Sequence, residues 1–402
     1  MIKYLGSKRR LVPVLTEICR ASGARTALDL FTGTTRVAQA FKAQGTHVTA
    51  VDSARYAHAF ARTYIETDAT ATDMDALSTA VAHLNGLPGK AGYVTEQFSR
   101  QARFFQPHNA ARIDAVRDAI DSEYAGSPLF PLLLTSLIEA ADRVDSTTGV
   151  QMAYVKQWAA RSFNPLELRV PELLAGPGHA IQGDAVALAG SPALGHVDLA
   201  YLDPPYNQHR YFTNYHVWET LVAWDAPEAY GVARKRVDAR DPSTHSVFNS
   251  KRTMPAALAS VVQSVDCDLL VLSYNNESWL GLDELEAMCS VVRPPSGDRG
   301  GGGGAARERE VATLAFDSAR YVGARIGIFN PSGDKVGRVG HLSNQELLVI
   351  AGEAALVRSV VEAVGSPAGA AAGAAAGAAA GAAAATSAMV APSMVDRLQK
   401  AT

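Results

Sequence analysis

The sequence predicts an α/β protein with a mostly parallel, Rossmann-like central sheet, a helical insertion and a disordered C-terminal tail. Short apolar runs alternate with segments of helical periodicity over the first 66 residues, and such runs return after residue 177. Between them, residues 67–176 have a mainly helical pattern, and the chain ends in a stretch rich in Ala and Gly. Buried parallel strands are typically short, nearly continuous apolar runs, which is the pattern on both sides of the insertion.

The first part of the predicted core spans residues 1–66. Patterns of helix, strand, helix and strand follow one another there, at residues 11–20, 26–31, 36–44 and 47–51. Gly45 ends the second helix, because glycine readily adopts the left-handed conformation found just after many helices. This order indicates a β-α-β unit.

The insertion and the second part of the core follow. The clearest helical segments of the insertion are residues 111–120 and 132–144. The second part, residues 177–361, has apolar strand patterns at residues 180–182, 196–202 and 268–273. Two later segments flank a turn signal and predict antiparallel strands at one side of the sheet; they are residues 321–329 and 346–350, with the turn at 330–335.

Two segments have the composition of flexible chain. Residues 300–304 are all glycine, and the tail, residues 362–402, is nearly all Ala and Gly between residues 365 and 391. The tail lacks the Leu, Ile and Phe that insert favourably into a bilayer, so it predicts a disordered linker and no membrane association.

Composition narrows the class further. Hydrophobic residues make up 48% and charged residues 19% of the chain, which is ordinary for a soluble globular protein. The N-terminus enters basic residues without the apolar stretch of a signal peptide, so we expect a cytoplasmic protein. The cysteines, Cys19, Cys267 and Cys289, lack the spacing of a disulfide framework or a zinc site, so no metal is expected.

Nucleic-acid binding has to rest on local charge, because the net charge is only −3. Residues 1–25 hold six Lys or Arg against Glu17, and residues 234–252 hold six against two acids. A stretch at residues 208–216 mixes aromatic and basic side chains in a way that suits phosphate and base contact. From these segments we expect contacts with nucleic acid from Arg210, Arg234, Lys235, Arg236, Lys251 and Arg252.

The strongest local signal directly follows the apolar run at residues 196–202. It consists of Asp203, Pro204, Pro205 and Tyr206. Two successive prolines cannot continue a sheet ladder, so they fix a rigid, exposed turn that projects Asp203 and Tyr206 from the carboxyl end of the strand. Open α/β sheets bind their ligands at this edge.

This motif and four other pieces resemble the Dam-like, D12 class of adenine-specific DNA methylases, within the amino-methyltransferases that carry a DPPY motif. The pieces follow the family's order along residues 1 to about 216. They are Tyr4 and Lys8 near the N-terminus, Asp29, Phe31 and Gly33 after the first strand, Asp52 after the second, Asp184 after the third, and the turn that begins at Asp203.

The resemblance implies a Rossmann-like S-adenosylmethionine-dependent methyltransferase fold and methyl transfer to the N6 amino group of adenine in double-stranded DNA. It also implies that these residues, including Asp203, lie at the cofactor, with Lys8 facing DNA as well. A glycine after the first strand and an acid about twenty residues later fit a nucleotide site independently. Where the family usually has a second glycine this chain has Thr35, which is expected to narrow the site near the methionine end.

The chemistry of an amino group accounts for the acidic turn. Asp203 and the carbonyl of Pro204 would accept the two amino hydrogens, and these bonds strengthen as positive charge develops on nitrogen. Tyr206 would stack on a base flipped out of the duplex. A cytosine carbon-5 methylase would need a suitably placed cysteine nucleophile, which the sequence lacks.

Several readings stay open from the sequence. An RNA (rRNA) adenine N6-methyltransferase carries the same motif, but the insertion of about 110 residues suits a DNA-recognition lobe better. N4-cytosine methylation is another option, although Asp rather than Ser before Pro204 favours adenine. Intact Asp203, Tyr206 and Asp52 argue against a non-catalytic binding module. We expect a monomer within a restriction-modification system, with room for a restriction endonuclease partner.

Overall fold

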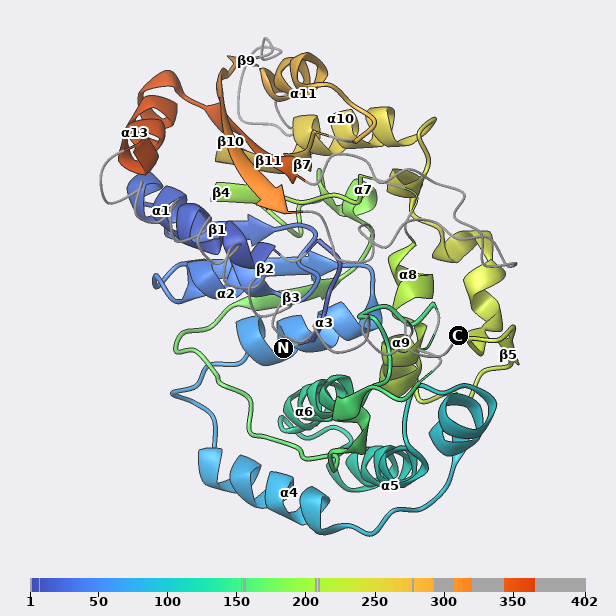
Figure 1. Ribbon diagram of the computed structural model, residues 1–402. Helices are drawn as coiled ribbons and strands as arrows, with labels where there is room; N and C mark the ends of the chain where they lie inside the picture. Colours follow the sequence, from blue (N-terminus) through green and yellow to red (C-terminus); the bar gives the residue numbers. More distant parts are fainter. Residues whose placement is uncertain are drawn as a thin grey trace, which may run out of the picture.

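The computed structural model has a mixed α/β architecture around a mostly parallel sheet (Figure 1). It describes residues 2–6, 8–152, 154, 157–206, 208, 210–276, 278–292, 307–319 and 343–365. Within these ranges the main sheet has seven strands, in the order β10-β11-β7-β4-β1-β2-β3. Their bounds are β1 Thr26–Asp29, β2 His47–Asp52, β3 His179–Gln182, β4 Val197–Leu202, β7 Cys267–Asn275, β10 Glu310–Ala319 and β11 Ser343–Gly352.

The parallel strands end at a common edge. Strands β7, β4, β1, β2 and β3 run parallel, and β11 runs antiparallel to both β7 and β10. Asp29, the last residue of β1, pairs with Ala50 and Tyr201, close to the ends of β2 and β4. The turns that leave these strands therefore face one another across the sheet edge.

Helices cover both faces of the sheet (Figure 1). Leu199 and Leu269 belong to one core and Ala200 and Leu270 to the other, as expected when successive side chains of a strand point to opposite faces. The first core includes α1 Val12–Ser22, α2 Arg36–Lys42, α3 Arg55–Ala61 and α13 Ala354–Gly365. The second includes α7 Ala185–Leu188, α10 Met254–Ser264 and α11 Leu282–Cys289.

The insertion packs onto the first core from beyond α3 (Figure 1). Its helices are α4 Met74–Gly86, the π-helix η3 Thr95–Gln101, α5 Pro107–Tyr124, α6 Phe130–Val144 and the 3-10 helix η4 Ala160–Phe163. Asp73 begins α4, because its side chain accepts a hydrogen bond from the Ala76 backbone N–H. Helix α6 and the later α9 His216–Ala223 both pack on α3, which joins the insertion to the site described below.

The remaining elements are short. The 3-10 helices are η1 Lys8–Arg10, η5 Val237–Arg240, η6 Pro242–Thr244 and η7 Val247–Asn249, and the π-helix η2 is Arg62–Glu66. Helix α8 spans Tyr211–Asn214. Two small antiparallel pairs join β5 Ala229–Tyr230 to β6 Lys235–Arg236, and β8 Val291–Val292 to β9 Arg307–Glu308.

Most predicted elements are present within a few residues of their expected bounds. Strand β11 confirms the antiparallel strand expected at residues 346–350, whereas its partner β10 was not predicted. The strand and turn expected at residues 321–335 and the glycine loop at 300–304 lie outside the described residues. In the part of the chain that is described, no helix has both the length and the apolar character needed to cross a bilayer.

The boundary expected for the tail falls inside a helix. Helix α13 continues to Gly365, and Val364 is buried in the first core. Its buried residues repeat at helical spacing and pack toward α1. Residues 366–402, on which the rest of the tail prediction falls, lie outside the described residues.

Candidate functional site

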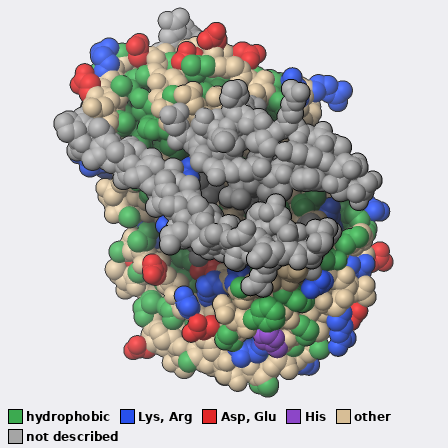
Figure 2. Space-filling view, viewed as in Figure 1, with side chains coloured by type: hydrophobic (Ala, Val, Ile, Leu, Met, Phe, Trp, Pro, Cys, Tyr) green, Lys and Arg blue, Asp and Glu red, His purple; other side chains and the backbone are tan. Residues whose placement is uncertain are grey.

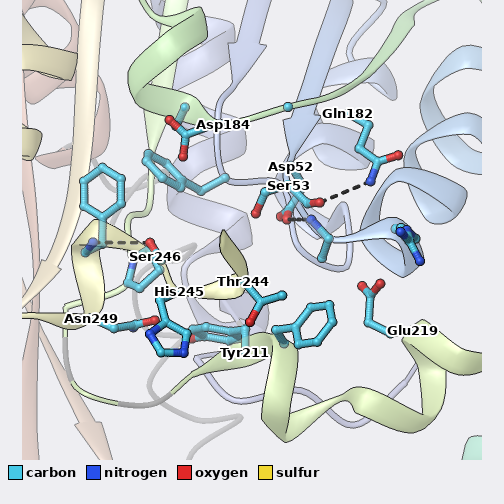
Figure 3. Close-up of a pocket in the computed structure, with 18 of the residues that line it drawn as sticks. Asp52, Ser53, Gln182, Asp184, Tyr211, Glu219, Thr244, His245, Ser246 and Asn249 are labelled. Atoms are coloured by element: carbon cyan, nitrogen blue, oxygen red, sulfur yellow. Dashed lines mark hydrogen bonds between the residues drawn. The ribbon is translucent and has the colours of Figure 1, made fainter. Parts of the chain in front are cut away.

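A cavity of about 490 Å³ opens where β1, β2, β3 and β4 end (Figure 3). Ligands of open α/β sheets bind at this edge, because the turns that leave neighbouring strands converge there. Of the sequence-predicted residues, Tyr4, Phe31, Asp52, Asp184, Asp203 and Pro205 line this cavity. The tertiary structure thus brings together residues that are up to 201 positions apart in the chain.

The turn after β1 places a buried acid beside a tight glycine. Asp29 is 1% exposed; its Oδ2 accepts a hydrogen bond from Thr32 Oγ1 at 3.0 Å, and Oδ1 has no partner among the described residues. Burial raises the pKa of Asp29 to about 7. Gly33 has φ of +49°, and a Cβ there would lie 3.1 Å from the Tyr4 ring, so both the backbone conformation and the close contact favour glycine.

The acids that end β2 and follow β3 are held by backbone N–H groups. Asp52 accepts from Gly33 N at Oδ2 and from Ala54 N at Oδ1, each at 2.9 Å. Burial nevertheless raises the pKa of Asp52 above its ordinary value. Asp184 begins α7, where Oδ1 accepts from the N–H groups of Val186 and Ala187. Both acids line the cavity. Asp184 therefore caps helix α7 and is also accessible to a bound ligand.

The turn after β4 was expected to be exposed, but in the structure its acid, Asp203, is largely buried and ion-paired. Lys8 Nζ lies 3.1 Å from Asp203 Oδ1 and 3.2 Å from Glu346 Oε2, and the side chains of Lys8 and Asp203 are 6% and 18% exposed. Burial opposes the charge on Lys8, but the two carboxylates outweigh it and raise the pKa of Lys8 well above its ordinary value. Burial also raises the pKa of Asp203 to about 6, and the charge of Lys8 acts against this increase.

Tyr206 packs in an aromatic and cationic environment. Its ring meets Tyr274 edge-on with centroids 5.6 Å apart, and Lys8 Nζ lies 5.6 Å from its centroid. Pro204 is buried, whereas Pro205 faces the cavity. Asp203 and Tyr206, which flank the two prolines in the chain, therefore both contact the same lysine.

Thr35 has an unusual backbone conformation and does not line the cavity. It adopts φ of +62°, is fully buried and begins α2. The narrowing expected from this threonine is not seen, because Thr35 is not among the residues that line the cavity. Its Oγ1 instead donates to Thr34 O at 2.7 Å and accepts from Gln39 Nε2 at 2.8 Å, which holds a β-branched residue in a conformation that usually favours glycine.

The predicted phosphate contacts divide into three groups, according to how far each side chain is buried. Arg236 is 2% exposed and its guanidinium bonds Asp225 and Asp238, each at 2.7 Å, so the expected surface role is wrong in this structure. Arg210 donates to Ala239 O and Arg234 donates to Gln97, and both side chains are half-buried, as is Lys235. Lys251 and Arg252 are exposed.

Basic side chains form no large separate field in the view of Figure 2. Lys and Arg are interspersed with Asp and Glu among the residues coloured there. This mixture of charges agrees with the net charge of −3, and Lys251 and Arg252 are the exposed members of the predicted set.

Sequence reasoning missed much of the cavity wall. Segment 238–249 supplies side chains across the cavity from the sheet, and Tyr211, Arg55 and Glu219 come from three different helices (Figure 3). The segment has ordinary turn signals: Asp241 and Ser246 cap η6 and η7, and Pro242 begins η6. Tyr211 belongs to an aromatic cluster in which Tyr4 stacks on Tyr215 with centroids 4.8 Å apart.

A separate group of potential metal ligands lies at the opposite edge of the sheet, where β4 and β7 begin. His196, Asp198 and Asp268 have ligand atoms within 4.8 Å of one another. His196 Nδ1 already pairs with Asp266 at 3.0 Å, and the Asp198 carboxylate accepts from two backbone N–H groups. His196 Nε2 also lies 3.4 Å from Asp268 Oδ2, so these side chains contact one another and their neighbours directly.

Comparison with known proteins matches this architecture to a described family. A family model for D12 class N6 adenine-specific DNA methyltransferases matches residues 4–288. The type II methyltransferase M.NlaIII of Neisseria lactamica is 29% identical over 300 residues, which cover 71% of this chain and 86% of that protein. The modification methylase StsI of Streptococcus sanguinis is 29% identical over 302 residues, and the type II methyltransferase M.FokI of Planomicrobium okeanokoites is 26% identical over 311 residues. The match spans 71% of this chain in both cases, but only 45% and 46% of those two longer proteins.

Proposed function

Because the chain belongs to the D12 class N6 adenine-specific DNA methyltransferase family, we propose that it transfers a methyl group from S-adenosylmethionine to the N6 nitrogen of adenine in double-stranded DNA. It is a DNA methyltransferase related to the modification methylases of restriction-modification systems. The finer proposal rests on one observation. Asp203, which follows β4, and Asp52, which ends β2, line the same cavity, and only β1 lies between these two strands in the sheet.

The residues of the cavity fit a cationic nucleoside cofactor. Asp52 and Asp184 supply carboxylates, and Tyr4 and Phe31 supply aromatic surface. Asp29 nearby has a buried carboxylate oxygen with no hydrogen-bond partner in the described part of the chain. Carboxylates accept hydrogen bonds from ribose hydroxyls and balance positive charge, and aromatic rings pack on a purine. When bound, S-adenosylmethionine would supply the electrophilic methyl group.

Asp203 and Pro204 would hold the nitrogen that is methylated. Above its pKa of about 6 the Asp203 carboxylate accepts one amino hydrogen, and the Pro204 carbonyl accepts the other. These two acceptors orient the nitrogen lone pair and stabilise the positive charge that develops on nitrogen. Since Asp203 Oδ1 faces Lys8, the incoming base shares the carboxylate with Lys8 or displaces it, and Glu346 keeps the lysine in place.

DNA binding would use base flipping and exposed basic side chains. The amino group is inaccessible within a duplex, so we propose that the base leaves the stack and packs on Tyr206. Lys251 and Arg252 are proposed to contact phosphates, with Arg210, Arg234 and Lys235 as further candidates after local rearrangement. Residues 67–176 are proposed to recognise the target sequence. We further propose a cytoplasmic monomer that protects sites from a partner restriction endonuclease.

The test is methyl transfer from tritium-labelled S-adenosylmethionine to duplex DNA of mixed sequence, followed by digestion and nucleoside analysis. Labelled N6-methyladenine is expected. Label in N4-methylcytosine would overturn the assignment of the base, and label found only when ribosomal RNA replaces DNA would overturn the assignment of the nucleic acid.

A further inference from the structure

Glu219 is a buried acid that the reaction at Asp203 does not use. It lies on α9, is 1% exposed, and its Oε1 has no hydrogen-bond partner among the described residues. A buried carboxylate oxygen without a partner is costly, and native proteins rarely keep one without a reason. Glu219 also lines the cavity, so a bound ligand can reach it.

Glu219 on α9 and Asp52 at the end of β2 both line the cavity and both contact the start of α3. Figure 3 shows the Glu219 carboxylate rising from α9 toward the segment that contains Asp52 and Ser53. Asp52 Oδ1 is bonded to the N–H of Ala54, and the backbone N–H groups of the next two residues, Arg55 and Tyr56, stabilise the charged form of Glu219. Ala54, Arg55 and Tyr56 are consecutive residues, so both acids accept hydrogen bonds from the backbone at the start of α3.

The neighbours of Glu219 leave its charge incompletely balanced. Burial raises the pKa of Glu219 to about 7, while Arg55, the N–H groups of α3 and Arg236 act in the opposite direction. Arg55 is an exposed side chain, and the guanidinium of Arg236 is bonded to Asp225 and Asp238. A hydrogen-bond donor from a ligand would therefore find an acceptor that the protein has not satisfied.

We propose that Glu219 binds the ribose of the cofactor, so that Glu219 and Asp52 together take the two hydroxyls of its vicinal diol. This inference rests on the proposed use of S-adenosylmethionine. Each Asp52 oxygen already accepts a backbone hydrogen bond, whereas Glu219 Oε1 is free to accept a hydroxyl. Two carboxylates that line one cavity can each accept a hydrogen bond from one hydroxyl of the diol, whereas a single carboxylate would have to serve both.

The test measures binding rather than turnover. Affinity for S-adenosylhomocysteine and for its 2′-deoxy and 3′-deoxy analogues is measured by calorimetry on the full chain and on Glu219→Gln. Losing a hydrogen bond to a charged acceptor is expected to weaken binding of the ribose form about tenfold or more. The same substitution should leave the affinity for one of the two deoxy analogues nearly unchanged, because that analogue lacks the hydroxyl that Glu219 binds. Glu228→Gln, an exposed acid outside the cavity, is the matched control.

Other outcomes separate the explanations. An equal loss of affinity for all three ligands would overturn the ribose assignment. A lower melting temperature of the free protein with unchanged affinity would show that Glu219 only caps α3. If Glu219→Gln does not fold, the test uses Asp52→Asn, in which Glu219 should still bind one hydroxyl. If that variant binds S-adenosylhomocysteine and both deoxy analogues equally well, Glu219 binds neither hydroxyl and the proposal is overturned. Wild-type protein that binds none of these ligands would instead count against the proposed cofactor itself.

Discussion

The Lys8 ammonium lies 3.1 Å from Asp203 Oδ1, so the proposed catalytic carboxylate is already ion-paired in the free protein. Glu346 lies on the antiparallel strand β11, and its carboxylate is 3.2 Å from the same ammonium. A lysine between two carboxylates can release one and keep the other. The pair thus offers a way to keep Asp203 charged until an adenine amino group arrives.

Replacing Asp203 should abolish methyl transfer while the fold persists. Asp203→Asn removes the charged acceptor for the adenine amino group, and such losses typically cost on the order of 10²–10³ in rate. Glu346 still pairs with Lys8, so the buried ammonium is not left alone. Tritium transfer to DNA measures the loss, circular dichroism checks folding, and Asp266→Asn, on the opposite edge of the sheet, is the control. A folded variant with near-normal transfer would refute the assigned role.

The two partners of Asp203 should shift its titration in opposite directions. Lys8 lowers and Glu346 raises the pKa of Asp203, which lies at about 6. Lys8→Met should therefore raise that pKa and move the acid limb of kcat/KM to higher pH, and Glu346→Gln should move it to lower pH. The measurement is a pH profile of kcat/KM for each variant, taken from initial rates of transfer at DNA concentrations well below KM. If the acid limbs of the two variants shift in the same direction, or if neither shifts, Asp203 is not the group that titrates in the reaction.

Gly33→Ala should damage both stability and cofactor binding. The new Cβ would lie 3.1 Å from the Tyr4 ring at φ of +49°, and the left-handed conformation alone costs roughly 1–2 kcal/mol for a residue with a side chain. Gly45→Ala is the matched control, because Gly45 has φ of +83° but open space around its Cβ position. Chemical denaturation should show a loss in both variants. Calorimetry should show weaker S-adenosylhomocysteine binding for Gly33→Ala alone, and equal affinity in the two variants would contradict the contact with Tyr4.

Exposed and buried basic residues should respond differently to loss of charge. The double change Lys251→Gln and Arg252→Gln should reduce the slope of log affinity against log salt by about 2 in magnitude, since each phosphate contact contributes about 1. Arg236→Gln should instead destabilise the fold by about 2–3 kcal/mol, because it leaves Asp225 and Asp238 without their shared cation; both are partly exposed, which limits the cost. Salt titration of DNA binding and chemical denaturation measure the two effects. An unchanged salt slope in the double variant would rule out its phosphate contacts.

Local patterns in the chain were enough to predict the sheet and the acids at its edge. The apolar runs before Asp29, Asp52 and Asp203 correspond to β1, β2 and β4, because a buried parallel strand needs apolar side chains on both faces. A residue that directly follows such a strand must emerge at its carboxyl end. Those positions therefore followed from neighbours within a few residues along the chain.

Contacts between distant segments could not be predicted in the same way. Lys8 and Glu346 are 338 residues apart. The basic segment that contains Arg236 has the composition of a surface patch, and the chain pattern does not show that Asp225 and Asp238 both pair with Arg236. The burial of Glu219 depends on how α9 packs on α3, which a helical pattern alone does not specify. The sequence by itself determined which strands form and which acids end them, since strand formation depends on local apolar pattern. Only the tertiary structure decided which charges are paired, which are exposed and which face the cavity, because pairing depends on the distance between atoms that chain folding brings together.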